Sequence, residues 1–144
     1  MRILFDTSVL VAALDQDHPK HEKALPWLSK AKAQKFEFII SSHTMAELYA
    51  VLSTLPVKPR ISPNVAWQLI HENIERTAKI VSLSPKEYCS FIKSSSDIGL
   101  SGGIIYDALI VKVARKSKVE RILTLNSRHF KRVWQGDENV LFEL

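Results

Sequence analysis

Residues 2–10 read Arg-Ile-Leu-Phe-Asp-Thr-Ser-Val-Leu, and this stretch decides the fold class. A short, largely apolar run ends at Asp6, and the polar residues Thr7 and Ser8 separate it from the apolar run 9–14. A short apolar run bounded by polar residues is typical of a buried strand, and Asp, Thr and Ser commonly begin a helix. The stretch therefore predicts a buried strand, a polar turn and a short helix.

The rest of the chain continues this alternation. Strands are predicted at 36–40, 79–83, 121–124 and 140–142, and helices at 18–34, 44–52, 64–76, from Pro85 onward and at 104–116. Prolines at positions 56, 59 and 63 are too dense for either regular element and predict a loop. The alternation favours a three-layer α/β/α sandwich with a central parallel sheet of about five strands.

Length and composition limit the possible classes of protein. The 144 residues match the commonest size of a single domain, so we expect one domain over 1–144. The single cysteine, Cys89, excludes an intramolecular disulfide framework and fits a reducing cytoplasm, where we expect it to be a core thiol. No apolar run approaches the ~20 residues of a membrane span, and the apolar start is expected to be a strand rather than a signal peptide.

Positive charge is concentrated late in the chain. The protein has 20 Lys and Arg against 15 Asp and Glu, a formal net charge of +5. Between positions 112 and 132 only Glu120 opposes a run of basic residues, and the candidates for binding RNA phosphates are Lys112, Arg115, Lys116, Arg128 and Arg132. Such a segment indicates a polyanionic partner, and its alternative is an ordinary solvated surface.

Four polar residues follow predicted strands or begin predicted helices. Asp6 ends the first strand, Glu47 lies one turn into the helix after the second, Asp107 begins the helix before the fourth, and Asn126 follows the fourth. Ligands of open parallel sheets bind beyond the carboxyl ends of the strands. These side chains converge if the first strand lies between the second and the fourth.

Each carboxylate also has a purely structural interpretation. Asp6 could cap the following helix, and Glu47 could be a solvated helix residue. Against this, Glu47 and Asp107 both lie among apolar residues, where an unpaired carboxylate is unfavourable. Three neighbouring carboxylates repel one another by roughly 4 kcal/mol per pair at 4 Å and an effective dielectric of 20, which favours binding of a hard divalent cation.

Oxygen ligands suit Mg²⁺ or Mn²⁺, and such an ion activates water and stabilises charge on a phosphate. Carboxylates for a metal and a basic flank for a polyanion together predict phosphodiester hydrolysis. The histidines form no HExxH pattern, which disfavours a metal role for them. The chain also has no GxGxxG, Walker or nucleophile-elbow motif, so nucleotide-binding folds and serine hydrolases are disfavoured.

Four stretches together resemble the successive motifs of the PIN-domain family. They are Ile3 to Leu10 around Asp6, Ser41 to Leu48 around Glu47, Ile105 to Val111 around Asp107, and Ile122 to Phe130 around Asn126. The resemblance spans nearly the whole chain, in order. Residues 55–63 also resemble a loop found in one branch of the family, and the size is similar to the VapC-type toxins of toxin–antitoxin pairs.

The resemblance implies a Mg²⁺- or Mn²⁺-dependent endoribonuclease that forms a homodimer and is silenced by a cognate antitoxin. It aligns Asp6, Glu47 and Asp107 with the metal-binding acidic residues of the family. Asn126 stands where the family commonly has a fourth acidic residue, which leaves open whether one or two ions bind. Thr7 and Thr124 occupy polar positions that the family uses around the site.

Two other interpretations remain open at this level. A receiver-like phospho-accepting domain also places an Asp at a strand end, but it would leave Glu47 and Asp107 without a role. A non-catalytic RNA-binding module on the same fold is supported by Asn126 and opposed by the three carboxylates.

Overall fold

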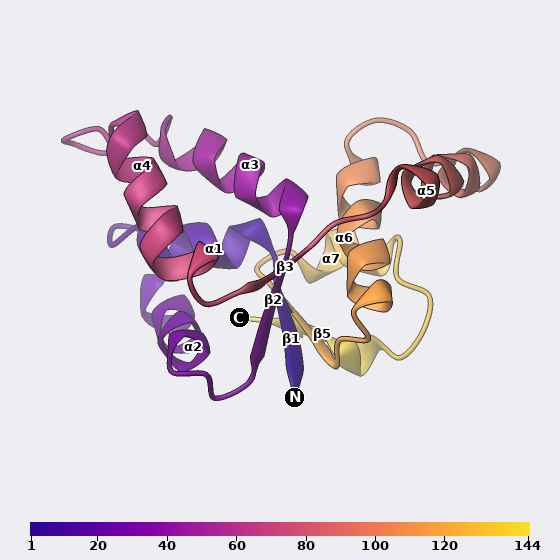
Figure 1. Ribbon diagram of the computed structural model, residues 1–144, viewed down its shortest axis with the longest axis horizontal. Helices are drawn as coiled ribbons and strands as arrows, with labels where there is room; N and C mark the ends of the chain where they lie inside the picture. The colour runs from indigo at the N-terminus through magenta and orange to yellow at the C-terminus, as the bar shows by residue number, and fades with distance from the viewer.

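The computed structural model describes residues 1–144 and contains one sheet of five strands. All neighbouring strands run parallel, in the spatial order β3-β2-β1-β4-β5 (Figure 1). The strands are β1 (Arg2–Phe5), β2 (Glu37–Ser41), β3 (Lys79–Val81), β4 (Arg121–Thr124) and β5 (Leu141–Glu143). The predicted parallel α/β class and all five strands are confirmed.

Helices alternate with these strands as the sequence predicts. They are α1 (Thr7–Leu14), α2 (His21–Lys32), α3 (Ser42–Leu52), α4 (Pro63–Ile70), α5 (Pro85–Asp97), α6 (Ile104–Lys116) and α7 (Ser127–Lys131). A π-helical turn, His71–Glu75, follows α4, and a 3₁₀ turn, Glu138–Val140, precedes β5. None of the helices has the length and apolarity that crossing a membrane requires.

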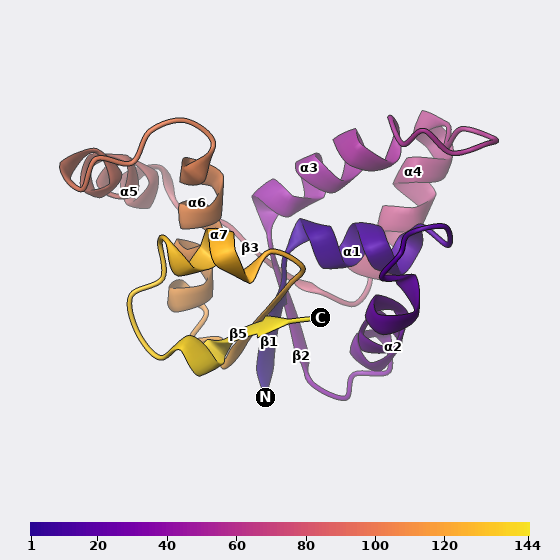
Figure 2. The same ribbon diagram turned by 180° about the vertical axis from the view of Figure 1, so that it is seen from behind.

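The helices form two layers, one on each face of the sheet. Figures 1 and 2 show α1 to α4 on one side of the strands and α5 to α7 on the other. Successive strand residues point to opposite faces. Accordingly Ile3 and Phe5 of β1 belong to the core beneath α1 to α4, whereas Leu4 belongs to the core beneath α5 to α7. The three-layer sandwich is therefore confirmed.

The strand order reverses beside β1. Strands β2 and β3 follow β1 on one side of it, and β4 and β5 lie on the other side. Leu4 of β1 pairs in register with Ile39 of β2 and with Ile122 of β4. Ligand sites of open parallel sheets lie at such a reversal, and a receiver-like sheet has a different strand order, 2-1-3-4-5. The topology thus removes the receiver-like alternative.

Local signals explain where several helices start. Ser62 accepts a hydrogen bond from the backbone N–H of Val65 at the start of α4. Ser84 and Glu87 form a reciprocal capping box at the start of α5. Proline stands at the first position of both helices, where its missing N–H has no intrahelical partner to lose.

The structure differs from the sequence-based expectations in four places. Pro63 begins α4 instead of belonging to the preceding loop, because a proline at the first helical position is favourable. The helix predicted over 64–76 ends at Ile70 and continues as the π-helical turn. Helix α7 was not predicted, since five residues are too few to show a helical period. Cys89 is exposed on α5, so the expectation of a core thiol was wrong.

Candidate active site

Asp6 lies at the carboxyl end of β1, where the strand order reverses. Its side chain is buried, with 8% of the residue exposed, and its backbone N–H donates to the carbonyl of Leu123 in β4 at 2.9 Å. Its Oδ2 accepts hydrogen bonds from the hydroxyls of Ser8 at 2.7 Å and Thr124 at 3.0 Å. Although Asp6 stands at the N-cap of α1, it makes no capping hydrogen bond. The backbone N–H groups of Thr7 and Ser8 are nevertheless close enough to lower the pKa of its carboxyl, so the start of α1 also stabilises this carboxylate.

Burial dominates the acidity of Asp6. It raises the pKa of the carboxyl above its ordinary value of 3.8, and the hydrogen bonds from Ser8 and Thr124 act in the opposite direction. Burial disfavours a charged carboxylate, whereas hydrogen bonds that it accepts stabilise the charge. Asp6 is thus a carboxylate held in place by protein donors and short of a compensating positive charge.

Glu47 and Asp107 approach Asp6 from the two helical layers. Glu47 lies in the second turn of α3 and Asp107 in the first turn of α6, and both are partly buried. Burial raises the pKa of Asp107, and the charges of Asp6 and Glu47 raise it further, against the lowering effect of His129 and Arg132. The charges of Asp6 and Glu47 therefore act on Asp107 in the direction that the sequence-based prediction of a carboxylate cluster requires.

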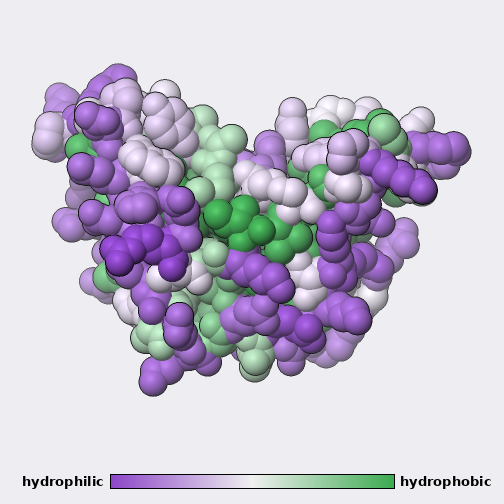
Figure 3. Space-filling view, in the orientation of Figure 1, coloured by the Kyte–Doolittle hydropathy of each residue, from purple (hydrophilic) through white to green (hydrophobic).

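The carboxylates border two adjoining cavities in the cleft between the layers. Figure 3 shows this hollow between the part of the surface formed by α3 and α4 and the part formed by α5 and α6. The polar cavity, of about 470 Å³, is lined by the three carboxylates together with Thr7, Ser8, Asn126 and His129 among others. The aromatic cavity, of about 520 Å³, is lined by the same carboxylates together with His43, Ala46, Gly103, Tyr106 and Ile110.

The donor set fits a hard divalent cation held in part through water. No three acidic, histidine or cysteine side chains lie close enough together to bind one ion directly. Mg²⁺ typically takes one or two carboxylates and completes its octahedron with water and substrate phosphate oxygens. Asp6, Glu47 and Asp107 border the same cavities, and each supplies only oxygen atoms. Three oxygen-donor carboxylates that border the same cavities match that coordination.

The predicted polar residues lie at different depths around the site. Asn126 is exposed at the N-cap of α7 and lines the polar cavity. Thr124 is fully buried; it donates to Asp6 and accepts from the backbone N–H of Asn126 at 2.9 Å. Thr7 is buried beside Asp6, and its hydroxyl has no hydrogen-bond partner. All three predicted residues therefore lie around Asp6: Thr124 through a hydrogen bond, and Thr7 and Asn126 as lining of the same cavity.

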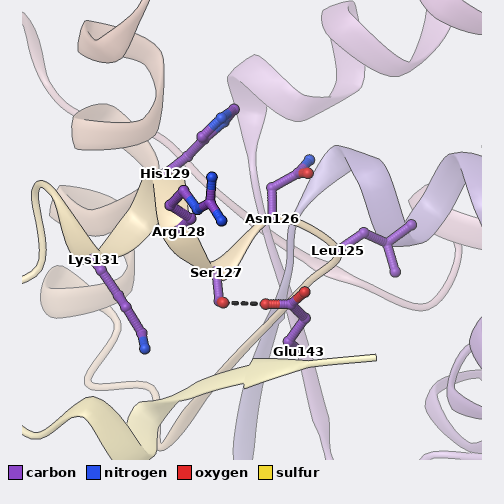
Figure 4. A pocket seen from close by; sticks show the side chains of 7 residues that line it. All are labelled: Leu125, Asn126, Ser127, Arg128, His129, Lys131 and Glu143. Atoms are coloured by element: carbon purple, nitrogen blue, oxygen red, sulfur yellow. Dashed lines mark hydrogen bonds between the residues drawn. The ribbon is translucent and has the colours of Figure 1, made fainter.

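A third cavity, of about 470 Å³, lies around α7 and shares Asn126 and His129 with the polar cavity. Figure 4 shows these two side chains on one side of α7, and Ser127 and Lys131 on the other. The hydroxyl of Ser127 donates to Glu143, which lowers the pKa of that carboxyl. The cavity therefore extends the site along a surface that includes basic residues.

The predicted basic residues fall into two groups. Lys116 lies 2.6 Å from Glu87 and donates to the carbonyl of Ser82, and Arg115 stacks on Trp134 and donates to Gln135. In contrast Lys112, Arg128 and Arg132 are exposed and form no ion pair in the structure. Intramolecular contacts therefore occupy two of the five, and three remain available to a polyanion.

Ser8 and His129 also border the site, and neither is among the residues predicted from the sequence. Ser8 links the ends of β1 and β4, because its hydroxyl donates to Asp6 and accepts from the backbone N–H of Leu125 at 3.0 Å. His129 lies one helical turn after Asn126 and faces the same cavity. The spacing of three residues between Asn126 and His129 places both on one face only if the segment is helical, and α7 was not predicted.

Comparisons with known proteins agree with this fold. The family model described as PIN domain matches residues 3–134. Ribonuclease VapC27 of Mycobacterium tuberculosis is 30% identical over 115 residues, which are 80% of this chain and 78% of the relative. Ribonuclease VapC40 from the same species is 31% identical over 123 residues, 85% of each protein.

The structure superposes on a protein of the VapBC2 complex of Rickettsia felis, solved bound to a DNA fragment from its promoter. The TM-score is 0.64 at 22% identity, over 100% of this chain and 99% of the other. The family model thus covers nearly the whole chain, and the ribonuclease relatives match about four-fifths of it. The chain belongs to the PIN-domain family and is a homologue of the VapC ribonucleases.

Proposed function

We propose that residues 1–144 act as one endoribonuclease domain that hydrolyses phosphodiester bonds in RNA with Mg²⁺ or Mn²⁺. The observation that carries the proposal is the meeting of Asp6, Glu47 and Asp107 at the same two cavities, at the reversal of strand order. The raised pKa of Asp107, caused by burial and then by the charge of Asp6, supports a site that favours a cation. The ribonuclease relatives support RNA as the substrate class.

The side chains of the site have different roles around the reacting phosphate. Asp6, Glu47 and Asp107 would hold the ion, directly or through water, and the Asn126 amide would orient a water molecule. When bound, a divalent ion supplies an activated water and stabilises charge that develops on the phosphate. Ser8 and Thr124 keep the Asp6 carboxylate in one orientation. Exposed Lys112, Arg128 and Arg132 would bind flanking phosphates without selecting sequence.

The proposal includes partners. A VapBC complex is among the structural matches, which supports a cognate antitoxin as the inhibitor of this protein and a role as the toxin of the pair. A homodimer is proposed from the family resemblance.

Cleavage of RNA by the purified full chain tests the proposal. We expect cleavage with Mg²⁺ or Mn²⁺, none with EDTA, and a loss well beyond the roughly 10–100-fold of an indirect effect in Asp107→Asn. Asp97→Asn, on the exposed end of α5, is the matched control and should cleave as the wild type does. Cleavage by Asp107→Asn at the wild-type rate would contradict the site. RNA that is bound but never cut would instead identify a binding module.

A further inference from the structure

The rings of His43 and Tyr106 stack across the cleft between the two helical layers. They are parallel to within 2°, with centroids 5.0 Å apart. His43 lies in the first turn of α3 and Tyr106 in the first turn of α6, and these helices lie on either side of the strand ends in Figure 1. Tyr106 nevertheless remains 53% exposed. The pair therefore presents an aromatic surface to solvent.

This aromatic surface borders the carboxylates directly. His43 and Tyr106 line the aromatic cavity, which shares Asp6, Glu47 and Asp107 with the polar cavity. The Nε2 of His43 lies 3.2 Å from Oε2 of Glu47, so the plane of the stack is anchored to a carboxylate. Tyr106 immediately precedes Asp107 in α6. A change in the position of either ring is thus linked to a carboxylate of the site.

The two cavities differ in the chemistry that they offer. Hydroxyls, an amide and an imidazole line the polar cavity beside the carboxylates. The aromatic cavity instead offers the two rings, the apolar side chains of Ala46 and Ile110, and the glycine at position 103. A nucleotide has the same division, with a charged phosphate joined to a flat base. A phosphate at the carboxylates leaves its neighbouring base within reach of the rings.

We propose that the His43–Tyr106 pair is a stacking platform for one base of the RNA, next to the phosphate that is cleaved. The proposal rests on the ribonuclease function proposed above. Unstacked bases of single-stranded RNA commonly stack on aromatic side chains, and every base has a face that can do so. The platform therefore positions single-stranded RNA and tolerates different bases. It makes Tyr106 a residue that positions the substrate, without acting on the reacting atoms.

Fluorescence of a single-stranded RNA that carries one 2-aminopurine tests the platform with the full chain. The measurements are made with Mg²⁺ and an RNA that has a non-cleavable linkage next to the 2-aminopurine, so that the RNA is bound but not cut. We expect the wild type to quench the fluorescent base by stacking. Tyr106→Ala should lose the quenching and bind between about 5- and 150-fold more weakly, the range measured for loss of one stacked base. Tyr106→Phe, which keeps the ring, should retain both quenching and affinity.

Two further variants separate the platform from a general effect on folding. Tyr88→Ala removes another exposed tyrosine, which lies on α5 and lines neither cavity, and should bind and quench as the wild type does. Gly103→Leu instead keeps both rings and adds a side chain at a residue that lines the aromatic cavity. Gly103 has φ −64°, and a Cβ there meets no atom within 4 Å, so the variant is free of backbone strain. It should weaken binding and reduce quenching with Tyr106 intact.

The outcomes distinguish the platform from the enzyme. Tyr106→Ala that folds and still quenches with wild-type affinity would overturn the platform, whether or not the wild type cleaves RNA. If Tyr106→Ala does not fold, unchanged quenching by Gly103→Leu overturns it. Absence of cleavage by the wild type with Mg²⁺ or Mn²⁺, alongside normal quenching, would instead overturn the proposed nuclease.

Discussion

The hydroxyl of Thr124 donates a 3.0 Å hydrogen bond to Oδ2 of Asp6, across 118 positions of sequence. The bond joins the carboxyl ends of β4 and β1, the two neighbouring strands at which the strand order of the sheet reverses. Thr124 also accepts the backbone N–H of Asn126, and it is fully buried. One side chain therefore orients a carboxylate and the residue that follows β4.

Thr124→Val should weaken the site without abolishing it. The isosteric change removes both hydrogen bonds, which should lower the free energy of unfolding by about 1–3 kcal/mol. Because Asp6 loses an orienting donor, Mn²⁺ affinity should fall by about 10–100-fold, as for other residues that orient a metal ligand. Urea unfolding and calorimetric titration measure the two effects. Thr54→Val is the control, because Thr54 is exposed just after α3 and its hydroxyl donates only to the nearby carbonyls of Ala50 and Val51. Unchanged metal affinity would show that Asp6 does not depend on Thr124.

Asp6→Asn should stabilise the metal-free protein at neutral pH. Burial raises the pKa of Asp6 in the folded state above 3.8, so the folded state holds the proton more tightly than the unfolded state does. The free energy of unfolding of the wild type therefore falls as pH rises from about 3.8 through the raised pKa. The variant lacks this loss, and its advantage should grow over that window by about 1.4 kcal/mol per unit of pKa shift.

Thermal or urea unfolding in EDTA between pH 3 and pH 8 measures this difference. Asp17→Asn, at an exposed position before α2, should follow the wild-type curve. A gap between Asp6→Asn and the wild type that stays constant with pH would contradict the assigned effect of burial.

Asn126→Asp should add a fourth negative charge to the polar cavity. With three carboxylates there, one divalent ion neutralises most of the charge, so a second ion should bind weakly without RNA. The variant should bind a second ion more tightly, need less Mg²⁺ for cleavage and be less stable in EDTA, because like charges repel. Calorimetric titration with Mn²⁺ measures the affinity. Asn64→Asp adds the same charge on α4 away from the cavities and should change none of these. No added affinity would place Asn126 outside the metal site.

Arg132→Met and Lys116→Met should affect RNA binding differently. Arg132 is exposed and close enough to Asp107 to lower its pKa, whereas Lys116 is held by Glu87 and Ser82. Each phosphate contact with single-stranded RNA contributes roughly 0.7 to the slope of log affinity against log salt. The slope should therefore become shallower by about that amount in Arg132→Met and stay unchanged in Lys116→Met. A shallower slope in Lys116→Met would show that RNA displaces the pairing with Glu87.

The same Lys116→Met variant has an effect on acid stability. The hydrogen bond from Lys116 is the largest cause that holds the pKa of Glu87 at about 2 instead of 4.5. A lowered pKa of a carboxyl stabilises the folded state above its ordinary value, and this contribution is lost as pH falls from 4.5 through about 2. Removal of Lys116 should raise the pKa of Glu87 toward 4.5, as a carboxyl NMR titration would measure.

Much of the fold was predictable because its signals are local. Apolar runs of strand length and serine–proline starts of helices depend on neighbouring residues, and the predicted strands, α5 and α6 follow them. The failures were elements too short to carry a pattern, as in α7, or a continuous helical pattern that changes to a π-helical turn after Ile70. Asp6, Glu47 and Asp107 were identifiable because a carboxylate at the end of a buried strand or among apolar helix residues is unfavourable unless it is paired, hydrogen-bonded or bound to a metal.

The sequence by itself determined the order of the elements, the parallel class of the sheet and the identity of the three carboxylates. Only the tertiary structure decided that β1 lies between β2 and β4, which brings those carboxylates to one pair of cavities. It also decided that Lys116 is occupied by Glu87, and that His43 stacks on Tyr106. These are contacts between residues far apart in the chain. They depend on which strands pair and which helices pack together, and the local periodicity of the sequence does not specify either.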